Sequence, residues 1–134
     1  MKKGFSQKKN VTSAIMATKS SKSKKANYTK AKFYIDKAIK NESTSGQAKT
    51  WYYKALIYAN LGNSKDPKAV EMQKTIDFDA EVLEAMKMTK KLDKKGDYKS
   101  KIIKLAAPMY DNSIKEGVAS YNDKNYEKAL GYFT

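Results

Sequence analysis

Apolar residues recur at the spacing of an α-helix along most of this chain. Ala31, Tyr34, Ile35, Ala38 and Ile39 follow the i, i+3, i+4, i+7, i+8 pattern that gives a helix one buried stripe. No stretch keeps the strict alternation of a half-buried strand. A length of 134 residues suits one domain, since domains most often contain roughly 100–150 residues. We therefore predict an all-α fold.

Capping residues and polar breakers divide the chain into helices. Asn27, Asp79 and Asn125 suit the N-cap position, and Asp66 followed by Pro67 is a strong helix start. The polar stretch 41–46 and Gly62 are expected to end the first two helices, and Pro108 to bend or break the long one near Ala107. The predicted helices cover residues 28–40, 47–61, 67–75, 80–92, 98–121 and 126–134. Residues 1–11 are expected to form a basic tail and residues 12–134 the helical domain.

The predicted helix 47–61 has apolar residues on two sides. Its first stripe consists of Trp51, Ala55 and Tyr58, and its second of Tyr52, Leu56 and Ala59. A helix that is apolar on two sides needs neighbours on both. We expect it to be an inner member of a stack of helices.

Missing residue types exclude several chemistries. The chain has no cysteine and no histidine, and all 28 basic residues are lysine. Zinc sites of thiolate and imidazole, Ser–His or Cys–His nucleophiles and arginine clamps are therefore impossible. The acids Asp77, Asp79 and Glu81 lie close together, but Asp79 and Glu81 suit the start of a helix. We predict no catalytic residue, no metal ligand, no cofactor and no enzymatic activity.

Positive charge gathers in the first third of the chain. Residues 1–40 hold 12 lysines and one acid, a net charge of +11 out of +14. Such a block attracts polyanions, either nucleic acid, acidic polysaccharide or an anionic membrane surface. Without arginine we do not expect base-specific recognition of nucleic acid. The candidate residues for this alternative function are Lys8, Lys9, Lys19, Lys22, Lys24 and Lys25.

The two ends of the chain raise expectations about the native protein. The first residues resemble the two ends of a secretory signal, but the apolar segment between them is absent. If such a segment preceded Gln7, we expect export to the periplasm; otherwise we expect a cytoplasmic protein. No run reaches the roughly 20 apolar residues of a membrane span. The last helical unit stops at Thr134 before it is complete, which indicates a longer native chain and an apolar end suited to self-association.

Two segments share a motif at the predicted turn between helices. Asn27-Tyr28-Thr29-Lys30-Ala31 and Asn125-Tyr126-Glu127-Lys128-Ala129 both read Asn-Tyr-x-Lys-Ala. Between them, Trp51, Ala55 and Tyr58 follow the spacing of a large, a small and an aromatic residue. In these features the chain resembles the tetratricopeptide repeat family, as found in bacterial helical-repeat proteins.

The resemblance covers residues 12–134 in about two and a half copies. It implies antiparallel helix pairs stacked as a short α-solenoid. Further matches are Ala31, Ile35 and Ala38 in the first copy and Gly117, Ala129 and Phe133 in the third. Lys54 stands where the family has leucine, Ser113 stands where it has an aromatic residue, and residues 64–77 form an insertion.

Function follows from the resemblance as an expectation. First helices in this family line a concave groove that holds a peptide or a partner helix, so the chain is expected to be a non-catalytic protein-interaction scaffold. Tyr52 and Tyr121 are the expected anchors, because tyrosine offers a large contact area at low entropic cost. The matching groove positions are Lys49, Tyr52, Leu56, Ala59, Asn60, Asp111, Ile114, Val118, Tyr121 and Asn122.

Overall fold

The structure is a computed structural model that describes residues 2–115, and the side chains of residues 9–107 within them. All regular secondary structure in this part of the chain is helical, with one isolated β-bridge between Ser21 and Lys24. The all-α prediction is therefore confirmed for residues 2–115, and the helix predicted over 126–134 lies outside them. The helices are α1 Lys2–Ala17, α2 Tyr28–Ile39, α3 Glu42–Ser45, α4 Ala48–Gly62, α5 Pro67–Gln73, α6 Phe78–Leu92 and α7 Lys99–Lys115.

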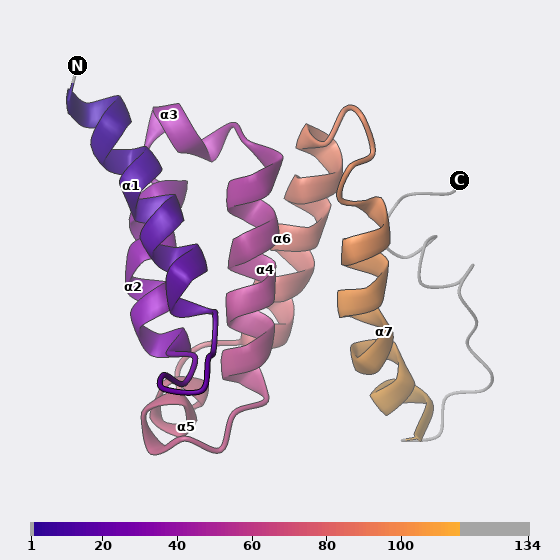
Figure 1. The fold of residues 1–134 in the computed structure, drawn as a ribbon. Helices are drawn as coiled ribbons and strands as arrows, with labels where there is room; N and C mark the ends of the chain where they lie inside the picture. The colour runs from indigo at the N-terminus through magenta and orange to yellow at the C-terminus, as the bar shows by residue number, and fades with distance from the viewer. Residues whose placement is uncertain (1, 116–134) are drawn as a thin grey trace.

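Helix α4 is the centre of the arrangement (Figure 1). It packs on α2 on one side and most extensively on α6 on another, while α1 packs on α2. Helix α5 lies at one end of the molecule, and α7 makes a smaller contact with α4. The helices thus pack mainly as α1 on α2, α2 on α4 and α4 on α6.

The predicted two-sided burial of α4 is confirmed, but the buried residues differ in part. Ala55 and Tyr58 of the first predicted stripe are buried and Trp51 is half-buried, whereas all three residues of the second stripe are only half-buried. The apolar pattern of the sequence does not reveal the second buried side of α4, because that side contains polar residues. Its buried members are Thr50, Lys54, Ile57 and Leu61.

Helix α1 was not expected from the sequence. Residues 2–11, predicted as a tail, form its first part, and the buried residues among its described side chains are Val11, Ala14 and Ala17. Three small apolar side chains in a lysine-rich segment make a weak periodic signal. They become buried because α2 provides the surface on which they pack.

Two helix starts agree with the capping prediction, and one differs. Asn27 caps α2 by accepting from the Lys30 amide, and Asp66 caps α5 by accepting from the Lys68 amide. Helix α6 begins two residues earlier than predicted, since Asp77 is its N-cap. Asp79 instead lies in the first turn, where its negative charge still favours the helix.

Two predicted interruptions behave differently from expectation. Of the two alternatives predicted near Ala107, a break does not occur, because α7 continues through Pro108 to Lys115, and a bend stays a prediction. A proline removes one backbone hydrogen bond, and a helix can continue past it with the bonds on either side. The polar stretch 41–46 does end α2, but it contains the short helix α3.

Gly62 is the last residue of α4, where the sequence predicts the end of this helix, and it also has a steric role. Among the described residues only Gly96 has a positive φ, at 75°, in the turn before α7. At Gly62, an added Cβ would lie 2.9 Å from the Phe78 Cβ, closer than real Cβ atoms come to a neighbour. The missing side chain therefore lets the end of α4 approach the start of α6.

Replacing Gly62 by alanine should destabilise the fold. The Phe78 Cβ is attached directly to the backbone of α6, so the contact can be relieved only by moving a helix. We expect Gly62→Ala to lower the free energy of unfolding in urea by about 1–3 kcal/mol. Gly46→Ala is the control, because an added Cβ there meets nothing within 4 Å. Equal effects of the two substitutions would contradict the steric role of Gly62.

Candidate functional site

The predicted groove residues of α4 share its least covered face. Lys49 is exposed, and Tyr52, Leu56, Ala59 and Asn60 are half-buried. The buried residues of α4 occupy the rest of its circumference. The Asn60 side-chain amide donates to the Leu56 carbonyl at 2.8 Å, so part of its hydrogen-bonding capacity serves its own helix. The remaining four side chains form a stripe that a partner can reach.

A cluster of three tyrosines lies at one end of this stripe. The ring centroids of Tyr52 and Tyr53 are 5.1 Å apart with planes at 73°, and those of Tyr52 and Tyr98 are 5.2 Å apart at 34°. The Lys101 ammonium lies 5.8 Å from the Tyr52 centroid and 5.3 Å from that of Tyr98. We call these four residues the tyrosine cluster. It joins α4 to the start of α7.

Asp93 holds the turn that brings Tyr98 to the cluster. Its carboxylate accepts from the Asp97 amide at 2.9 Å and from the Tyr98 amide at 2.7 Å. The turn also needs the positive φ of Gly96. Tyr98 is thereby fixed by local hydrogen bonds as well as by ring packing.

The phenols of Tyr52 and Tyr98 are held in the neutral form. Burial raises the pKa of Tyr52 above 10.0, and the nearby phenols of Tyr53 and Tyr98 raise it further. Burial likewise raises the pKa of Tyr98, with added contributions from Tyr53, Asp93 and Asp97. Near neutral pH each hydroxyl can therefore donate a hydrogen bond to an acceptor such as a peptide carbonyl.

The other groove positions are only partly described. Asp111 and Ile114 lie in α7, but their side chains are outside the described set, and Val118, Tyr121 and Asn122 lie outside the described residues. The sequence did not point to Tyr53, Tyr98 or Lys101. Tyr53 carried a signal, since it is adjacent to Tyr52, but the approach of Tyr98 depends on how α7 folds back.

The lysines of the alternative function are largely accessible. Lys9 is exposed on α1, and Lys19, Lys22, Lys24 and Lys25 are exposed in the connection between α1 and α2. Backbone hydrogen bonds between Ser21 and Lys24 tighten this connection into a turn. The Lys8 side chain is not among those described.

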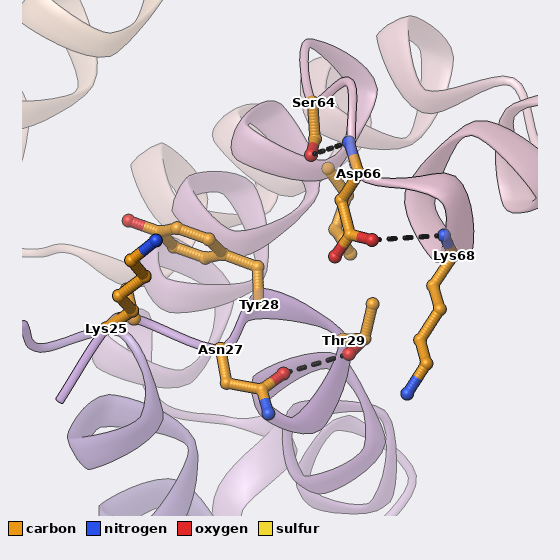
Figure 2. A pocket seen from close by; sticks show the side chains of 9 residues that line it. Lys25, Asn27, Tyr28, Thr29, Ser64, Asp66 and Lys68 are labelled. Atoms are coloured by element: carbon orange, nitrogen blue, oxygen red, sulfur yellow. Dashed lines mark hydrogen bonds between the residues drawn. The ribbon is translucent and has the colours of Figure 1, made fainter.

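One of these lysines borders a hollow of about 570 Å³ between the starts of α2 and α5 (Figure 2). Figure 2 shows the two caps facing one another across it: Asn27 Oδ1 accepts from the Thr29 hydroxyl, and Asp66 Oδ1 accepts from the Lys68 amide. These cap oxygens are thus already engaged. Lys25 and Lys68 are the cationic residues that line the hollow.

A second polar cluster lies inside the structure, between α2, α4 and α6. Lys54 is only 5% exposed, and its ammonium lies 2.8 Å from the Glu81 carboxylate and 5.0 Å from the Tyr58 ring centroid. The Tyr58 hydroxyl donates to Asp36 at 2.5 Å, and Lys32 pairs with the same carboxylate at 2.8 Å. These groups satisfy one another, so the cluster serves to join the three helices.

The part of the chain that the structure describes contains no group of three or more acidic residues arranged to hold a metal ion. No helix in this part combines the length and the apolar character needed to cross a membrane. Comparison with family models, with curated proteins and with solved structures finds no match to this chain.

The Tyr58 hydroxyl should make stability depend on pH in the alkaline range. Burial, followed by the hydrogen bond and the charge of Asp36, raises its pKa well above 10.0 in the folded state. Its stabilising contribution is therefore complete below about pH 10 and is lost as pH rises further. We expect Tyr58→Phe to lower the free energy of unfolding by about 1.5 kcal/mol at pH 7, and by less above pH 10.

Urea unfolding at several pH values measures this difference. Tyr34→Phe is the matched control, because that half-buried tyrosine has no hydroxyl hydrogen bond to a described residue. If Tyr58→Phe lowered the free energy of unfolding by the same amount at every pH up to 11, the hydroxyl would ionise equally in the folded and unfolded chains. That result would contradict the prediction.

Proposed function

We propose that this protein is a non-catalytic interaction scaffold that binds a peptide or a partner protein along the open face of α4. In this proposal α1 with α2 and α4 with α6 are successive helix pairs of a tetratricopeptide-like stack, and α7 opens a third. The order of packing supports it, because α2 contacts α4 and α4 contacts α7. The insertion between α4 and α6 contains the extra helix α5.

The tyrosine cluster is the observation that carries the proposal. Tyrosines combine a large apolar surface with a polar tip, and they lose little conformational entropy on binding. Here ring packing and the Asp93 turn already fix two of them, which lowers the entropic cost further. Lys49 and Lys101 are exposed cations on the same surface and suit acidic groups of a partner.

Loss of the Tyr52 side chain should abolish most binding at this face. A random peptide library selected on the full chain supplies the ligands, whose affinities are then measured by fluorescence anisotropy. We expect Tyr52→Ala to weaken a selected groove peptide by about tenfold or more, which corresponds to about 1.4 kcal/mol. Since the contact is mainly aromatic, the affinity should change little between low and moderate salt.

Tyr28→Ala provides the control. Tyr28 is also half-buried, but it lines the hollow at the start of α2. It should leave the affinity of the groove peptide unchanged. Failure of the library to give any peptide sensitive to Tyr52, with both variants as helical as the parent chain, would refute the proposed binding face.

The exposed lysines between α1 and α2 favour a second candidate function, binding of a polyanion. Lys19, Lys22, Lys24 and Lys25 are all exposed within one short connection. Lysine ammonium groups bind phosphates and sulfates as point charges and release counterions. This second candidate function does not depend on the open face of α4.

Its test uses heparin and an oligo(dT) strand as probes. Replacing Lys22, Lys24 and Lys25 together by glutamine should weaken the binding of both probes. It should also reduce the steepness of the slope of log K against log salt concentration by about two to three. Tyr52→Ala should have no effect on these probes. An unchanged salt slope in the triple variant would exclude this connection as the polyanion site.

A further inference from the structure

Phe33 is unusual among the large apolar residues of α2. It is 57% exposed, and its ring is held in place on the surface. The Lys37 ammonium lies 4.1 Å from the ring centroid, and Tyr34 meets the ring edge-on at 5.4 Å. One exposed apolar residue is common in soluble proteins. Whether such a residue indicates a binding surface depends on the residues around it.

A hollow of about 460 Å³ lies beside Phe33, between α2 and α5. Met72 of α5 lines it, and the same residue lines an adjoining hollow of about 600 Å³ along α5. We call the two together the α2–α5 groove. Its charged lining residues are Lys32, Asp36 and Lys37 of α2, Lys40 directly after α2, and Lys68 and Glu71 of α5.

The acids of this groove are neutralised and several of its cations are not. Asp36 is engaged by Lys32 and by the Tyr58 hydroxyl, and Glu71 pairs with Lys74 at 3.0 Å. No described carboxylate pairs with the remaining lysines of the groove, which are Lys37, Lys40 and Lys68. The groove therefore combines the apolar side chains of Phe33 and Met72 with a positively charged rim.

We propose that the α2–α5 groove docks an acidic segment of another protein, which inserts a large apolar side chain between Phe33 and Met72. Its carboxylates would pair with the lysines of the rim. Charge complementarity selects this occupant: a second copy of the chain would bring another +14 to a surface that is already positive. The lysines of the rim alone would also suit a nucleic acid, but Phe33 and Met72 favour an occupant that brings a large apolar side chain as well.

This surface is separate from the tyrosine cluster. Phe33, Lys37 and Lys40 lie on the side of α2 opposite its buried stripe of Ala31, Ile35 and Ala38, and the groove is completed by α5. The tyrosine cluster lies on α4 and at the start of α7. The two proposals can therefore fail independently.

The test is a library of random 12-residue peptides selected on the full chain, with clones that also bind Phe33→Ala removed. The peptides that remain should contain several acidic residues and at least one large apolar residue. Phe33→Ala should lower the affinity of these peptides tenfold or more. Replacement of both Lys40 and Lys68 by glutamine should lower it threefold or more. Amide NMR shifts on adding such a peptide should centre on Phe33, Lys37 and Met72.

Met16→Ala is the matched control, since Met16 is 61% exposed on α1, away from the groove. It should leave peptide affinity unchanged, as should Tyr52→Ala. Three results would overturn the inference: selected peptides without acidic bias, oligo(dT) producing the same NMR shifts and the same dependence on Phe33, or a dimer in sedimentation that Phe33→Ala dissolves. The last would identify a second copy as the occupant.

Discussion

The enclosure of α4 by α2 and α6 is the constraint on which the rest of the structure depends. Polar groups cross both of its packing surfaces: Lys54 pairs with Glu81 of α6, and Tyr58 donates to Asp36 of α2. A buried ammonium without its partner would be strongly destabilising, so these bonds demand one particular register of the three helices. Gly62 then allows the end of α4 to lie against Phe78.

This enclosure also decides which surfaces remain for binding. With two sides of α4 buried, only the stripe that carries Tyr52 stays open, and the turn held by Asp93 adds Tyr98 to it. On α2, too, the buried side decides which residues stay exposed. Burial of Ala31, Ile35 and Ala38 leaves Phe33 outward, where α5 completes a groove. One surface is mainly aromatic and the other is apolar with a cationic rim, so the two proposed partners differ in chemistry.

Much of the fold was predictable because the signals are local. The Asn27 and Asp66 caps satisfy amides two or three residues away, and the stripe of α2 repeats within one helix. The features that the sequence did not predict share a physical cause. Helix α1 and the polar buried side of α4 become stable only through contacts with other helices, and the helix around Pro108 continues despite a local penalty. A shared face on α4 was also predictable, since it follows from helical spacing alone.

The sequence by itself determined the all-helical class, the position of most helix ends after α1, the lack of imidazole and thiol chemistry, and the lysine-rich first third. Each of these depends on residue type or on spacing within one helix. Only the tertiary structure decided that Lys54 is buried, that Tyr98 and Lys101 lie beside Tyr52, and that Phe33 and Met72 line the same hollow. These contacts join residues from different helices. Their distances depend on how the helices pack, which no pattern within a single helix specifies.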